Sequence, residues 1–156
     1  MSNKQIVLSM LLLTSIAATP AFAQEAETAE VQLSQTWQQL NPAWTGVSNK
    51  VVEFVGEAKQ VILADLAYAA VAGDICQTVE LDKVKFQSAF DDGFTPDSST
   101  TVSAEERTLY GNKVSMFFGV YVGLLTAYGL MDRASFCGFA EQMMTNGENQ
   151  YWLTRP

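Results

Sequence analysis

An uncharged and largely apolar segment, Val114 to Met131, constrains the fold more than any other feature of the sequence. It is eighteen residues long, and no charged side chain lies between Lys113 and Asp132. Such a segment is either the buried central helix of a small domain or a helix that crosses a membrane, for which about 20 apolar residues are needed. The rest of the sequence has to decide between these two structures.

The N-terminal segment, residues 1–23, has the three parts of a cleavable secretory signal peptide. Lys4 supplies a positive charge, Ile6 to Ala18 is an apolar run, and Ala21-Phe22-Ala23 provides the small residues of a cleavage site. We therefore expect cleavage near Ala23 and Gln24. The mature protein is then expected in the periplasm or secreted.

The cysteine pair argues for the buried helix. Cys76 and Cys137 are the two cysteines of the chain, and an exported protein with one such pair is expected to form one disulfide. If residues 114–131 crossed a membrane, Cys137 would lie in the reducing cytoplasm and could not pair with Cys76. The basic residues that flank the segment also show no positive-inside bias. A membrane-associated subunit that uses residues 114–131 stays as an alternative.

Apolar spacing then predicts an all-α fold. After an N-terminus expected to be mobile, residues 24–31, we expect a single helical domain over residues 32–156. It is a small bundle of about five helices around a central apolar helix, about 104–130, with one disulfide. Capping residues and turn signals divide the chain into two short pieces around Pro42, a long helix from Ser48 to Ile75, and helices over Lys83 to Asp92, Ser103 to Met131 and Arg133 to Asn146.

Small residues recur every fourth position in the central helix. Such a row forms a shallow groove along which another helix can pack closely. The alanine-rich stretch from Ala64 to Ala72 is the expected partner, and a disulfide at one pole would make the two long helices run parallel. The row consists of Gly111, Ser115, Gly119, Gly123 and Ala127.

Composition excludes several classes of chemistry. The chain has no histidine, which is the commonest general base and metal ligand, so we predict no metal site and no cofactor. Its net charge of −8 repels nucleic acid and anionic membrane surfaces, and no basic stripe offsets it. The chain is therefore not expected to bind nucleic acid.

A few individual residues are candidates for function. Trp37, Trp44 and Trp152 could form an exposed surface that binds a partner, or they could cover a small core. Lys59 falls among apolar positions of its helix, and Asp65 lies at the border of an apolar run. Either could be a functional group, but a lysine stem that reaches solvent and a carboxylate at the rim are the favoured explanations.

These observations favour a non-catalytic function. We expect a small, acidic, exported protein that acts by binding or protein–protein interaction, as an inhibitor, chaperone or assembly partner. Its ligand or protein partner is not identified by any motif. The alternatives are the membrane-associated subunit and an envelope enzyme that depends on a carboxylate or on Lys59.

Overall fold

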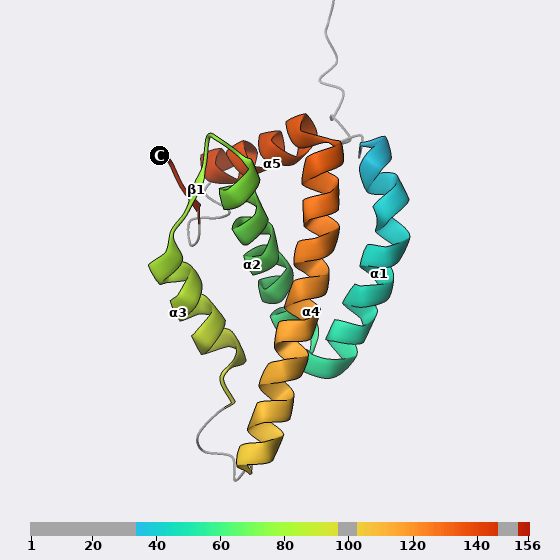
Figure 1. Cartoon of the computed structure of the whole chain (residues 1–156), viewed down its shortest axis with the longest axis vertical. Helices are drawn as coiled ribbons and strands as arrows, with labels where there is room; N and C mark the ends of the chain where they lie inside the picture. The colour runs from blue at the N-terminus through green and yellow to red at the C-terminus, as the bar shows by residue number, and fades with distance from the viewer. Residues whose placement is uncertain (1–33, 97–102, 147–152) are drawn as a thin grey trace, which may run out of the picture. The chain divides into compact units, whose positions relative to one another are not determined.

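Five helices dominate the fold, as the sequence predicts. The computed structural model describes residues 34–96, 103–146 and 153–156, all within the unit Leu33–Pro156. The predicted signal peptide, the predicted mobile N-terminus and Trp152 lie outside the described residues. The helices are α1 (Gln35–Val55), α2 (Glu57–Ile75), α3 (Lys83–Phe94), α4 (Ala104–Met131) and α5 (Arg133–Asn146). Figure 1 shows α4 at the centre of this all-α bundle, so the predicted fold class is confirmed.

Helix α4 begins at a capping box. The backbone N–H of Glu106 donates to Oγ of Ser103 at 3.2 Å, and the backbone N–H of Ser103 donates to Oε2 of Glu106 at 2.9 Å. These two bonds satisfy amides that a helix start leaves without a partner, and they hold the pKa of Glu106 below its usual range. The long apolar helix therefore has a well-defined first turn.

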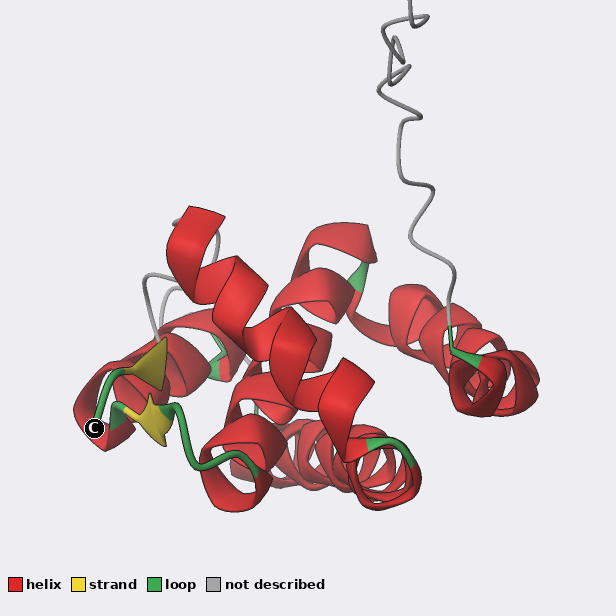
Figure 2. Ribbon diagram, turned by 90° about the horizontal axis from the view of Figure 1, so that it is seen from above, coloured by secondary structure: helices red, strands yellow, loops and turns green. Residues whose placement is uncertain are grey.

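Helices α2 and α4 lie side by side in the core and run in the same direction. Helices α2 and α4 both rise towards the same end in Figure 1, with α3 as the return path between them. More residue contacts join α2 to α4 than any other pair of elements. Figure 2 looks along these helices and shows α5 lying across their ends. The predicted parallel arrangement is confirmed.

The disulfide closes that end of the bundle. Cys76 follows the last residue of α2, Cys137 lies in the first turns of α5, and their Cα atoms are 5.6 Å apart. A buried hydrogen bond reinforces the junction, because the hydroxyl of Tyr68 donates to the carbonyl oxygen of Phe136 at 2.6 Å. The predicted disulfide is confirmed.

The boundary between the first two helices differs from the prediction. We expected a break at Pro42 and a continuous helix from Ser48 to Ile75, and both expectations are wrong. Helix α1 passes through Pro42 and ends at Val55, and Gly56 separates it from α2 with a φ of 84°. Glycine adopts this left-handed conformation without steric cost, so it allows the chain to reverse direction there. The loss of one donor at Pro42 is tolerated within a helix of 21 residues.

Two short strands are an element that we did not predict. β1 (Glu80–Leu81) and β2 (Leu153–Thr154) pair antiparallel, with Glu80 opposite Thr154. Leu153 is almost fully buried, so the pairing fastens the last described residues of the chain to the segment that follows α2. Figure 2 shows the pair beside the C-terminus.

Candidate functional site

One side of α4 is covered by protein and the other is open. The buried residues of α4 recur along one stripe that contacts α1 and α2: Val114, Phe117, Tyr121, Leu125 and Gly129. At 100° per residue, the opposite arc of about 120° carries exposed apolar and small residues, and at its lower end it also carries Glu105, Asn112 and Lys113. We call the apolar and small part of this arc the outer face of α4, and it consists of Leu109, Met116, Gly119, Val120, Gly123, Leu130 and Met131, all of which are exposed.

The outer face is large and apolar for an exposed surface. Met116 is 54% exposed, Leu130 70% and Met131 62%. Gly119 and Gly123 have no atom within 4 Å of where a Cβ would stand, so they form an open notch between the larger side chains. Contiguous apolar patches on a soluble domain mark interaction sites more often than isolated exposed leucines do.

The predicted role of the small-residue row is therefore wrong. The Cβ positions of Gly111, Gly119 and Gly123 have no atom within 4 Å, and Gly119 and Gly123 lie on the outer face, so these glycines do not pack against the alanines of α2. The buried residues of α2 include many alanines, and those of α4 are mostly large, so small side chains of α2 meet large side chains of α4. The close approach between the helices falls instead at Gly129, where a Cβ would lie 2.9 Å from Cδ1 of Ile75.

A buried polar network holds the rotation of α4. Nε2 of Gln60 donates to the hydroxyl of Tyr121 at 2.9 Å, and that hydroxyl donates to Oγ of Ser48 at 3.0 Å. Tyr121 has no exposed surface, so these bonds satisfy the phenol inside the core. Rotating α4 would break both bonds, and the outer face therefore stays turned to solvent.

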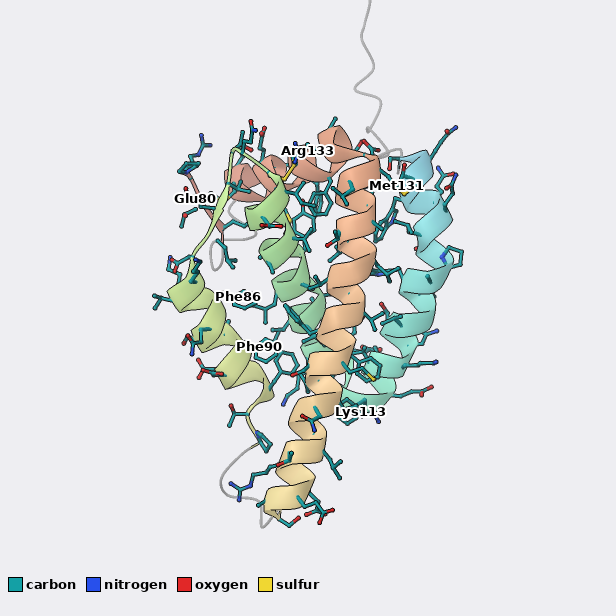
Figure 3. All side chains as sticks on the ribbon, viewed as in Figure 1. Glu80, Phe86, Phe90, Lys113, Met131 and Arg133 are labelled. Carbon is teal, nitrogen blue, oxygen red and sulfur yellow. A yellow bond between two sulfur atoms is a disulfide. The ribbon has the colours of Figure 1, made fainter. Side chains whose placement is uncertain are left out.

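Lys113 does not place its charge in the middle of the outer face. Its ammonium lies 4.2 Å from the centre of the Phe54 ring, in a cation–π contact with α1. Figure 3 shows Lys113 in the lower half of α4, with Met131 and Arg133 at the upper end. The stretch between Lys113 and Asp132 has no charge, so solvent meets only uncharged side chains there.

The two described candidate tryptophans cover the core on the other side of α4. Trp37 and Trp44 meet edge to face with their ring centroids 5.2 Å apart. Trp37 also packs against Tyr128, and Trp44 packs against Tyr121 at 4.7 Å. Both side chains are half-buried, so they cover the edge of the core rather than forming a fully exposed surface.

Lys59 and Asp65 are not brought together. They are both half-buried on α2, but six positions separate them, which places them about 120° apart around the helix and about 9 Å apart along it. Burial raises the pKa of the Asp65 carboxyl. The arrangement therefore gives no support to an acid–base pair made of these two residues.

Two hollows lined by described residues are small. One of about 240 Å³ lies between the segment after α2 and the C-terminal residues, and Glu141 and Arg155 line it. Another of about 150 Å³ lies between α3 and α4, beside Phe90 and Gly111. Pockets for small ligands usually measure about 300–1,000 Å³. Within residues 34–96, 103–146 and 153–156, no group of three or more acidic or cysteine side chains could hold a metal ion.

Helix α4 is also long and apolar enough to cross a membrane, by length and composition alone. Its most apolar window has a mean hydropathy of 1.7, and 28% of that window is buried in the protein. However, α1 and α2 pack along the covered side of α4 and carry charged residues, among them Lys50, Glu53 and Asp65. A spanning α4 would draw these charges into the hydrocarbon, at a cost of several kcal/mol.

Comparison of the chain with models of known protein families, with curated proteins and with solved structures finds no match.

Proposed function

We propose that this chain is an exported, non-catalytic interaction protein whose binding surface is the outer face of α4. The observation that carries the proposal is the exposure of Met116, Leu130 and Met131 on a helix whose opposite side packs against α1 and α2. Export to the periplasm or outside the cell belongs to the same proposal, and it is supported by the order of charge, apolar run and small residues in residues 1–23.

The arrangement of the fold supports a surface of this kind. The capping box, the disulfide and the Tyr121 network fix α4 at its start, near its end and in its middle. A rigid helix loses little conformational entropy when it binds, and its apolar strip can then contribute most of its area to association. The partner that suits it is an apolar helical surface rather than a charged one.

A photoreactive amino acid at Val120 tests the proposal in the cell. Val84 is the matched control, because it is an exposed valine on α3, away from the outer face, and is 80% exposed against 39% for Val120. Irradiation is expected to give a larger covalent adduct with the probe at Val120 and none with the probe at Val84. Equal yields from both positions, or no adduct from Val120, would contradict the proposal.

A further inference from the structure

We infer that the outer face of α4 associates with a second copy of the same chain, packed antiparallel around a two-fold axis between Gly119 and Val120. The inference rests on the proposed function, because it uses the same surface and names its occupant. It is carried by the charges at the two ends of α4 and by the order of large and small residues between them.

The distribution of charge favours a second copy at this face. The chain has seventeen acidic and nine basic residues, so two copies repel each other over most of their surfaces. The outer face carries no charge between Lys113 and Asp132, so its approach to an identical face brings no like charges into contact over that stretch. Self-association is therefore least opposed at this strip.

The charges at the ends of α4 select the antiparallel direction. Glu105 and Glu106 are exposed in its first turn, and Arg133 is exposed immediately beyond its last turn. Figure 3 shows Arg133 at the same end as Met131. An antiparallel pair places the two glutamates of each copy beside Arg133 of the other, and it also opposes the helix dipoles. A parallel pair would place glutamates beside glutamates and Arg133 beside Arg133.

In the antiparallel pair, a large side chain of one copy lies opposite open space beside a glycine of the other copy. With the axis between Gly119 and Val120, Met116 lies opposite Gly123 of the second copy, where no atom stands within 4 Å of a Cβ position. The same symmetry sets Leu109 opposite Leu130. Both contacts occur twice because a two-fold interface is self-complementary. Small residues at such a crossing let the two helix backbones approach closely.

The size of the strip predicts a reversible dimer. Helix α4 has 28 residues, and the outer face extends over most of its length, which gives a strip about 30 Å long and about 10 Å wide. Stable interfaces bury about 800 Å² on each partner, so this contact falls among the weaker specific ones. We expect the monomer and the dimer to exchange at protein concentrations between about 1 μM and about 1 mM.

Sedimentation equilibrium of the processed protein, purified after export, is the first test. The wild type is expected to show a monomer–dimer equilibrium, and Val120→Glu is expected to raise the dissociation constant by at least about 10-fold. Val84→Glu adds the same charge to another exposed valine and is expected to leave the constant unchanged. A wild type that stays monomeric at about 1 mM, or equal weakening by both variants, would overturn the inference.

A charge exchange tests the direction of packing. Arg133→Glu is expected to weaken the dimer, and the double variant Glu105→Arg with Arg133→Glu is expected to restore it. The pair leaves the net charge of the wild type unchanged, so general repulsion cannot explain the recovery. Failure of the double variant to recover, with its helix content intact by circular dichroism, would contradict the antiparallel pair.

Covalent linkage gives the register. A short bismaleimide is expected to join Met116→Cys of one copy to Gly123→Cys of another when the two variants are mixed, and to join neither variant to itself. Same-residue products would contradict the antiparallel register. If the purified protein stays monomeric while the photoprobe at Val120 still yields a specific adduct with another protein, self-association is wrong and the proposed function stands. If neither occurs, both are wrong.

Discussion

Gly73 of α2 lies directly against Leu81 of β1, and a Cβ atom on residue 73 would stand 3.0 Å from the backbone nitrogen of Leu81. The nearer contact, at 2.9 Å, is to the Cβ of Leu81. Neither atom is the free end of a flexible side chain, so no rotation can relieve the overlap. Gly73 therefore fixes how closely the segment after the disulfide returns to α2.

Gly73→Ala is expected to lower the free energy of unfolding by about 1–3 kcal/mol, since the added methyl group overpacks a close contact. Urea denaturation measures the change. Gly46→Ala is the matched control, because Gly46 is also inside a helix but has open space around it. There the methyl group should raise the free energy of unfolding by up to about 1 kcal/mol through helix propensity. Equal losses in the two variants would show that the Leu81 contact is unimportant.

Removing the disulfide is expected to destabilise the bundle more than any single surface change. The Cys76→Ala, Cys137→Ala double variant should lose about 2–5 kcal/mol, because the bond closes a loop with a sequence separation of 61 residues. The loss should appear in urea denaturation as a lower midpoint. A reduced wild type should match the double variant, and a change below about 1 kcal/mol would mean that α5 stays docked without the bond.

The pH dependence of stability should separate Asp65 from Asp132. Burial raises the pKa of Asp65 in the folded state above its ordinary value of 3.8, so the folded state binds the proton more tightly than the unfolded state does. The free energy of unfolding therefore falls as the pH rises from the ordinary pKa through the raised pKa of the folded state. Asp65→Asn cannot ionise. Its free energy of unfolding, relative to wild type, should therefore be higher at about pH 7 than at about pH 3.

Asp132 should behave in the opposite way. Hydrogen bonds to its carboxyl, first from the backbone N–H of Ser135 and then from the Ser34 and Ser135 side chains, lower its pKa. A lowered pKa contributes stability above the ordinary value and loses it as pH falls towards the folded value. Asp132→Asn should thus be less stable than wild type at about pH 7, with the difference vanishing in acid. Parallel pH profiles for the two variants would contradict both assignments.

The proposed export predicts a defined N-terminus. N-terminal sequencing of the protein recovered outside the cytoplasm should start at Gln24, and Ala23→Arg should leave the segment attached because the cleavage site requires a small residue there. Recovery of the unprocessed wild-type chain in the cytoplasm would contradict the predicted localisation.

Local patterns predicted helices and caps well. Helices α3 and α4 begin within one residue of the predicted positions, where Asp82 accepts the backbone N–H of Lys85 at 3.1 Å and Ser103 pairs with Glu106, and α5 has the predicted bounds. These features depend on neighbours within four residues, which a single sequence contains. The cysteine pair added one long-range constraint, and with it the parallel course of α2 and α4.

The rotation of α4 could not be predicted in the same way. Its apolar residues occupy the whole circumference, so periodicity does not distinguish the covered stripe from the outer face. Two features of the packing determine which side of α4 is covered. The alanines of α2 leave room for large side chains of α4, and the hydroxyl of Tyr121 forms hydrogen bonds with Gln60 and Ser48. Such partners lie more than 60 residues from Tyr121 in the chain, so only the assembled fold identifies the exposed face.

Methyl NMR of the processed protein tests the central claim, that the outer face of α4 is the contact surface, most directly. The methyl signals of Met116, Val120 and Met131 are followed from dilute to concentrated protein and after addition of envelope extract, with Val84 as the internal reference. We predict that the three outer-face signals shift or broaden while that of Val84 does not. Unchanged outer-face signals under both conditions, or equal changes at Val84, would contradict the claim.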